Sequence, residues 1–188
     1  MLKLYYTTTA GEDQVQPKSY RSLGGYKSSS LVKNDDFDNF FGEITNYTIS
    51  QNNQNQYIGV ILKNEGTALT NILFYFTTAS DSYSEWEIAA VDLATDGDGV
   101  KFMENIPTIH SMPTSASFNK AEGFGNAVDL GDLAQDEKIG LWFKRIILVD
   151  KAKADKADLT EEDPENENRV VEKEKAKSDT IEMTFSYD

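Results

Sequence analysis

The sequence predicts an all-β fold, an antiparallel β-sandwich of the immunoglobulin-like or jelly-roll kind. Short segments in which apolar and polar residues alternate recur along the chain, and β-branched and aromatic residues dominate them. Clusters of Gly, Asn, Asp and Ser separate these segments, with no amphipathic helical pattern in between. The chain has no cysteine, so the Cys…Trp…Cys signature of an immunoglobulin domain is absent and both topologies stay open.

The first three predicted strands are residues 2–7, 56–64 and 69–77. Residues 2–7 alternate apolar side chains with more polar ones, and every second side chain of residues 56–64 contributes to one apolar face. Residues 69–77 repeat this pattern with isoleucine and phenylalanine. Because the turn-forming sequence Asn-Glu-Gly at 64–66 separates the second strand from the third, we predict that these two strands pair as a hairpin.

Three further strands are predicted at residues 85–93, 138–149 and 179–187. The first alternates Glu and Ala with larger apolar residues, the second is long and apolar, and the third has one solvated face. The adjacent glycines Gly24 and Gly25 indicate a tight turn or a close approach of two backbones.

We expect one domain over residues 1–188, because a chain of this length can bury about 70% of its unfolded surface in a single core. Two stretches are too polar for that core. Residues 50–56 read Ser-Gln-Asn-Asn-Gln-Asn-Gln, which is typical of a loop tip. Residues 151–179 are dominated by Lys, Glu, Asp and Ala, and they are predicted to form a charged insertion before the last strand, either flexible or projecting as an arm.

Charge and composition exclude several classes of function. The chain has 18 Lys+Arg against 32 Asp+Glu, a formal net charge of -14, and a pI of about 4.4. Nucleic acids and anionic membranes both require a basic surface, so neither is an expected partner. The longest apolar runs are only a few residues, against the roughly 20 that cross a bilayer. Without cysteine there is no thiol catalysis and no Cys-ligated metal, and we expect no cofactor.

Two motifs invite a chemical interpretation, and neither predicts an enzyme. The Asp-Gly-Asp-Gly turn at 96–99 offers carboxylates to a calcium ion, but Ala94 and Asn105 stand where the anchoring ligands belong, so we predict an ordinary turn. The single histidine, His110, lies near Ser111 without a nucleophile-elbow motif and is interpreted as a loop histidine. Two acids could still cleave glycosides, because that chemistry is defined by distance rather than by sequence spacing.

Aromatic residues concentrate in the first quarter of the chain, at Tyr5, Tyr6, Tyr20, Tyr26, Phe37, Phe40, Phe41 and Tyr47. Exposed aromatic rings are common on sugar-binding and protein-binding faces. We expect about half of this set to be core. The phenylalanines among them are predicted to fill one end of the sandwich.

Several blocks of sequence follow one another with a spacing that is more specific than any block alone. They are SLGGYKSSS at 22–30, NFFGEI at 39–44, YIGVILKN at 57–64 with LTN at 69–71, DLGDL at 129–133 and LWFKR at 141–145. Over residues 22–147, with 180–187 as the closing strand, the chain resembles a family of small structural proteins of tailed-bacteriophage virions. In that family the 57–71 blocks form paired strands, DLGDL forms a turn and LWFKR lies on the penultimate strand. The charged stretch 151–179 departs from the family, in which a shorter connection is expected.

The resemblance implies a non-enzymatic component of the virion, assembled in the bacterial cytoplasm, with no catalytic residues to carry over. It would act outside the particle in multiple copies, as a capsid decoration, a head-fibre anchor, or a neck or tail component. Its partners would be capsid, portal, neck or tail subunits. We hypothesise that an acidic neighbour is contacted by Lys144, Arg145, Lys151, Lys153 and Lys156. The alternative function is a module that adheres to surface glycans through loop aromatics.

Overall fold

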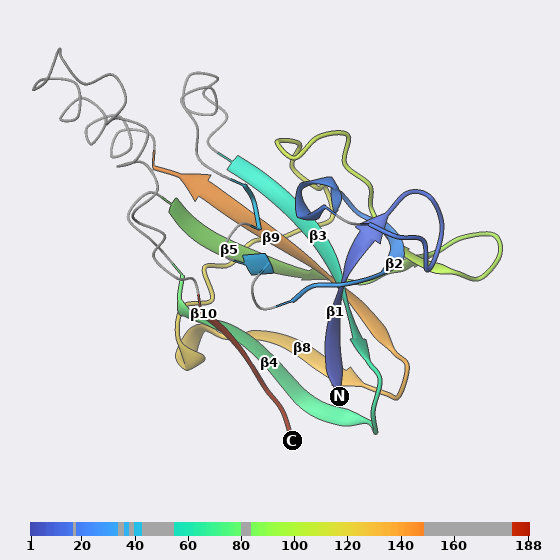
Figure 1. The fold of residues 1–188 in the computed structure, drawn as a ribbon. Helices are drawn as coiled ribbons and strands as arrows, with labels where there is room; N and C mark the ends of the chain where they lie inside the picture. The colour runs from blue at the N-terminus through green and yellow to red at the C-terminus, as the bar shows by residue number, and fades with distance from the viewer. Residues whose placement is uncertain (17, 34–35, 38–39, 43–54, 80–83, 149–181) are drawn as a thin grey trace, which may run out of the picture.

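The protein is an antiparallel β-sandwich, seen in a computed structural model that describes residues 1–16, 18–33, 36–37, 40–42, 55–79, 84–148 and 182–188. Seven strands form sheet A in the order β5-β9-β3-β1-β2-β7-β6, and three form sheet B in the order β10-β4-β8 (Figure 1). The predicted fold class is therefore confirmed. The predicted insertion at 151–179 lies outside the described residues. Within them, no helix is long and apolar enough to cross a membrane.

Sheet A contains β1 (Leu2–Thr8), β2 (Gly25–Leu31), β3 (Asn55–Asn64), β5 (Ser84–Val91), β6 (Ala94–Thr95), β7 (Lys101–Met103) and β9 (Lys138–Ile147). Sheet B contains β4 (Leu69–Thr78), β8 (Val128–Leu133) and β10 (Glu182–Ser186), and two 3-10 helices are η1 (Ser19–Arg21) and η3 (Phe124–Asn126). Each predicted strand segment overlaps one of these strands, with ends that differ by a few residues at most. The strands that alternation did not reveal are β2, which is rich in serine, β6 and β7, which are very short, and β8.

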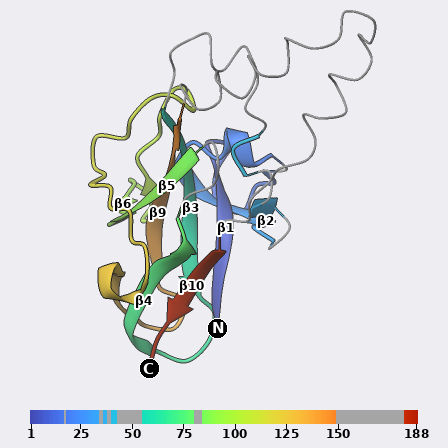
Figure 2. The same cartoon turned by 90° about the vertical axis from the view of Figure 1, so that its left-hand side faces the viewer.

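The main core lies between the two sheets, which Figure 2 shows as two layers. Ile58, Val60 and Leu62 of β3 face this core, as their alternation predicts. The opposite face of sheet A is also covered, because Ile61 and Trp142 belong to a second apolar cluster. Sheet A is thus buried on both faces over part of its area, which makes its central strands the most apolar of the chain.

The predicted hairpin between the second and third segments is wrong. Strand β3 pairs with β1 and β9 in sheet A, whereas β4 pairs with β10 and β8 in sheet B. The Asn-Glu-Gly sequence is a corner that carries the chain from one sheet to the other. Asn64 fixes this corner, because its buried side-chain amide donates to the carbonyls of Thr67 (2.7 Å) and Leu133 (3.0 Å).

The turn expected at 129–133 is also wrong, because these residues belong to strand β8. Gly131 has a φ of 72°, and the pairing with β4 is irregular at that point, so the glycine supports a bulge within a strand. The prediction for Gly24 is confirmed. A Cβ atom at this position would lie 1.8 Å from the carbonyl oxygen of Glu104, so two backbones do approach closely there.

Candidate functional site

The residues predicted to contact a neighbour lie on and after β9. Lys144 is half-buried, and its Nζ is 2.7 Å from Oε2 of Glu87, the residue directly opposite on β5. Lys151, Lys153 and Lys156 lie outside the described residues. Lys144 is therefore the one described lysine of this set, and its charge is already balanced within the sheet.

Arg145 has an internal role that the sequence did not predict. It is 7% exposed, and its guanidinium donates to Oε1 of Gln56 (2.8 Å from Nε), to the carbonyl of Gly42 (2.9 Å) and to that of Phe41 (3.3 Å). The same group lies 5.1 Å from the centre of the Phe41 ring. Arg145 thus holds residues 41–42 against the sheet. It also explains why Gln56, expected in a polar loop tip, is buried at the start of β3.

The sequence blocks that carry the family resemblance meet in this framework. Ser22 of the first block donates from Oγ to the carbonyl of Gly59 in the third (2.5 Å), and the Ser22 hydroxyl also accepts the Thr7 amide (2.6 Å). Phe40 of the second block stacks on Trp86 and contacts the ring of Phe143 in the LWFKR block. The phenylalanines predicted to fill one end of the sandwich are therefore core residues, with Phe40 1% exposed. These blocks build the framework of the sandwich.

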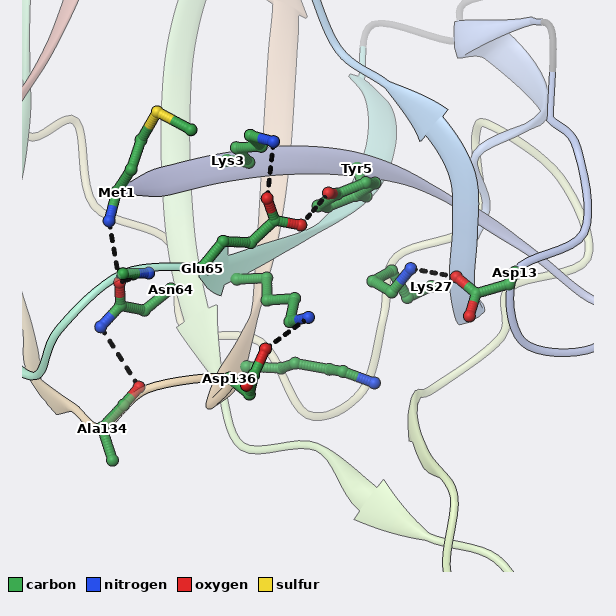
Figure 3. A network of polar contacts seen from close by, with 12 residues as sticks. Met1, Lys3, Tyr5, Asp13, Lys27, Asn64, Glu65, Ala134 and Asp136 are labelled. Carbon is green, nitrogen blue, oxygen red and sulfur yellow. Dashed lines mark hydrogen bonds and ion pairs between the residues drawn. The ribbon is translucent and has the colours of Figure 1, made fainter.

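The outer face of sheet A carries a row of three lysines, Lys3, Lys63 and Lys138, which we call the lysine row. They lie directly opposite one another on β1, β3 and β9. Like charges in this arrangement repel, so each requires a counter-charge. Lys3 pairs with Glu65 (2.5 Å; Figure 3), Lys63 with Asp136 (2.7 Å) and Lys138 with Glu12.

The acids that balance the lysine row come from three different connections. Glu12 follows β1, Glu65 lies at the corner between the sheets, and Asp136 lies in the turn before β9. Single ion pairs between side chains as exposed as these stabilise a protein by about 0.2–1 kcal/mol each. Their combined effect is to fasten three loops to one face of the sheet, which is a structural role.

Tyr5 and Lys27 extend this network toward β2. The Tyr5 hydroxyl donates to Glu65, the Lys27 ammonium pairs with Asp13, and that ammonium lies 4.5 Å from the centre of the Tyr5 ring (Figure 3). Hydrogen bonds from Lys3 and then from Tyr5 lower the pKa of Glu65 from 4.5 to about 2. Burial, followed by the bond to Glu65, raises the pKa of Tyr5 to about 12. Both groups therefore keep one protonation state over the neutral range.

A surface depression of about 640 Å³ lies beside η1 and the end of β2. Its lining combines polar and apolar surface: Tyr6, Gln16, Lys18, Ser19, Tyr20, Ser30, Leu31, Lys33, Asp36 and Gly42. Tyr20 is 45% exposed, with the Lys18 ammonium 5.7 Å and the Arg21 guanidinium 5.9 Å from its ring centre. Two residues of this lining, Tyr6 and Tyr20, belong to the aromatic set that the sequence singled out, and of these Tyr6 is buried and Tyr20 is exposed. No motif marks the lysines, because which cations remain unpaired depends on the fold.

The two motifs considered for chemistry are engaged locally. Asp96 accepts the amides of Asp98 (2.9 Å) and Val100 (2.8 Å), as expected of an ordinary turn, and these backbone bonds, that from Val100 foremost, lower its pKa. His110 places Nδ1 3.0 Å from the carbonyl oxygen of Asn55. Across the described ranges, no cluster of three or more His, Asp or Glu side chains could hold a metal ion.

Comparisons of the chain with protein-family models, with curated proteins and with solved structures found no match.

Proposed function

We propose that this chain is a non-enzymatic structural component of a tailed-phage virion. It would be an external accessory protein, whether capsid decoration, head-fibre anchor, or neck or tail component, present in multiple copies. The observation that carries this proposal is the convergence of the family-like blocks on the framework of the sandwich. A family that shares an architecture is expected to preserve such residues, whereas a family of enzymes is expected to preserve a catalytic cluster.

The charge of the chain supports the same proposal. A net charge of -14 keeps the protein away from packaged DNA, which an external component must not bind. Modest contacts suffice when many copies attach to a repetitive shell, because the effects of the contacts multiply.

The contact with an acidic neighbour is proposed for Lys144, Lys151, Lys153 and Lys156. In this proposal Arg145 serves the contact indirectly, by holding β9 and residues 41–42 together. Binding of an acidic neighbour at Lys144 would compete with Glu87 for the same ammonium.

The test mixes the purified chain with phage particles assembled without it and follows binding by co-sedimentation and negative-stain imaging. We expect the chain to occupy regular positions on the particle. Reversing the charge of Lys151, Lys153 and Lys156 together should weaken that binding. The matched control is Lys101→Glu, which changes an exposed cation on β7 and should leave binding intact. A chain that ignores the particles would contradict the proposal.

A second function, adhesion to surface glycans, is favoured by one observation, the exposed Tyr20 ring beside the surface depression. Binding pockets commonly pair a small number of polar groups with an aromatic surface. The two functions are compatible, because external virion proteins can also contact the surface of a host cell.

A further inference from the structure

We propose that the depression beside η1 binds a saccharide that carries a carboxylate group. This inference rests on the second function above and names its ligand class. The residues that carry it are Tyr20, Lys18, Arg21 and Lys33, with hydrogen-bonding groups from Gln16, Ser30 and Asp36 in the same lining.

The distribution of unpaired positive charge is the first argument. Among the residues that the structure describes, and leaving Arg145 aside, four side-chain cations form no ion pair: Lys18, Arg21, Lys33 and Lys101. Lys18 and Lys33 line this depression together with the Asp36 carboxylate, and Arg21 lies next to it, with its guanidinium 5.9 Å from the centre of the Tyr20 ring. In a chain with a net charge of -14, such a concentration creates a local site for an anionic group on a surface that otherwise repels anions.

The aromatic ring is the second argument. Tyr20 lies in η1, where 45% of it stays accessible to solvent. A sugar ring presents aliphatic hydrogens on one side and hydroxyls at its edge, so it can pack against the tyrosine while its substituents reach polar neighbours. Lys18 and Arg21 lie over the ring, 5.7 and 5.9 Å from its centre, so a sugar would pack on the part of the ring that stays exposed, with its carboxylate within reach of these cations.

The polar rim is already fixed in position, which lowers the entropy cost of binding. Asp36 accepts the Lys33 amide at Oδ2 (2.8 Å), and the pKa of the Tyr6 hydroxyl is raised by burial and by the nearby Asp36 carboxylate. Ser30 accepts the Gln16 amide at Oγ (3.0 Å), and the Gln16 side chain donates to the carbonyl of Arg21 (3.3 Å). The volume of about 640 Å³ lies within the usual range for small-ligand sites.

A saccharide fits this site better than an acidic peptide. Peptides commonly bind by adding a strand to an open sheet edge, but here the outer edge of β2 is covered, since the Ser29 amide donates to the carbonyl of Gln14 (3.0 Å). The Asp36 carboxylate in this lining can accept the hydroxyls that a saccharide offers and that the acidic side chains of a peptide lack.

The test titrates the isotope-labelled full chain with two matched pairs of probes at millimolar concentration and follows amide shifts by NMR. The pairs are trigalacturonate with its methyl ester and sialyllactose with lactose. We expect at least one acidic member to shift the amides of residues 16, 18–21 and 30–33. Its neutral partner should bind roughly three- to tenfold more weakly, as the loss of one or two exposed ion pairs implies.

Separate variants test the contribution of the Tyr20 ring and the contribution of the cations. Tyr20→Ala should weaken binding about fivefold or more, whereas Tyr187→Ala, which removes another half-exposed tyrosine, should not. Replacing Lys18 and Lys33 with Gln should reduce the preference for the acidic probe, and Lys101→Gln should leave it unchanged. These exposed positions should tolerate substitution without unfolding.

Each contrary outcome has one meaning. Equal binding of acidic and neutral sugars at these amides would overturn the carboxylate preference and leave glycan adhesion standing. The absence of amide shifts with all four sugars would overturn both the carboxylate preference and glycan adhesion. Hexaglutamate, titrated in the same way, tests an acidic peptide. If it shifts these amides and no sugar does, the proposal of a saccharide ligand is wrong and the depression is a protein-docking site.

Discussion

Replacing Asn64 should reveal how much the corner between the sheets contributes to stability. The side chain is fully buried and makes five hydrogen bonds. Its amide group donates to the carbonyls of Thr67, Leu133 (3.0 Å) and Ala134 (3.2 Å), and its oxygen accepts from Gly66 (3.0 Å) and the Met1 amine (3.2 Å; Figure 3).

The magnitude follows from which groups water can reach after truncation. In Asn64→Ala the carbonyl of Leu133 loses a buried donor, at a cost of about 1–3 kcal/mol. The other four groups are partly buried and recover water, so each should cost about 0.5 kcal/mol. Because such effects are not fully additive, we expect a loss of about 3 kcal/mol in the free energy of unfolding.

Asn64→Asp keeps the volume of the side chain but removes its amide donor, so it tests whether the hydrogen bonds or the volume stabilise the corner. The carboxylate would face three carbonyl oxygens that now receive a donor, and we expect their repulsion to outweigh the attraction of the Met1 amine and so to raise its pKa. At neutral pH this variant should therefore be no more stable than Asn64→Ala. Because the folded pKa is raised, the penalty should shrink as the pH falls and the unfolded carboxyl, with a pKa of about 3.9, also becomes protonated.

Urea unfolding followed by tryptophan fluorescence measures these differences. The matched control is Asn119→Ala, an exposed asparagine whose side chain makes one long bond (3.4 Å to the carbonyl of Ser117), and it should change stability by less than about 0.5 kcal/mol. A loss below about 1 kcal/mol in Asn64→Ala, or an Asn64→Asp variant as stable as the unmodified chain at neutral pH, would refute the corner argument.

Three further substitutions test other contacts. Arg145→Lys should destabilise the chain by about 2 kcal/mol in urea unfolding, because an ammonium cannot reach the three acceptors that the guanidinium bridges; unchanged stability with lost particle binding would instead indicate a direct contact. Glu65→Gln should lower the free energy of unfolding by about 1 kcal/mol at neutral pH after solvent screening. Because folding lowers the pKa of this carboxyl, its contribution to stability should disappear as pH falls from 4.5 toward 2. The unfolding curves of the variant and of the unmodified chain should converge in that pH range. Gly24→Ala should lower the melting temperature sharply, because its Cβ would collide with the Glu104 carbonyl at a φ of 89°, whereas Gly97→Ala, with open space around it, should not.

The fold class and the core faces could be predicted because alternation is a local property. In β3, the residues Ile58, Val60 and Leu62 face one core cluster and Ile61 the other, as their spacing requires. The pairing of strands is not local. The sequence after Asn64 is compatible with a hairpin, and the contacts that place β4 in the other sheet are distant in sequence: its pairing with β8 and β10, and the amide bonds from Asn64 to Leu133 and Ala134, about 70 residues away.

The candidate site illustrates the same limit for charge. From sequence, Lys63 and Lys18 are equivalent cations, but folding places Lys63 2.7 Å from Asp136 and leaves Lys18 beside Tyr20 without an acid. Composition gives the sum of all charges and therefore the repulsion that an anion feels at a distance. Ion pairing within the fold decides whether the electrostatic potential next to a given part of the surface is positive or negative. A strongly acidic chain can therefore still present a local site for an anion. Salt screens the distant repulsion as well as the local attraction, hence it should accelerate both the association and the dissociation of an acidic ligand at this depression.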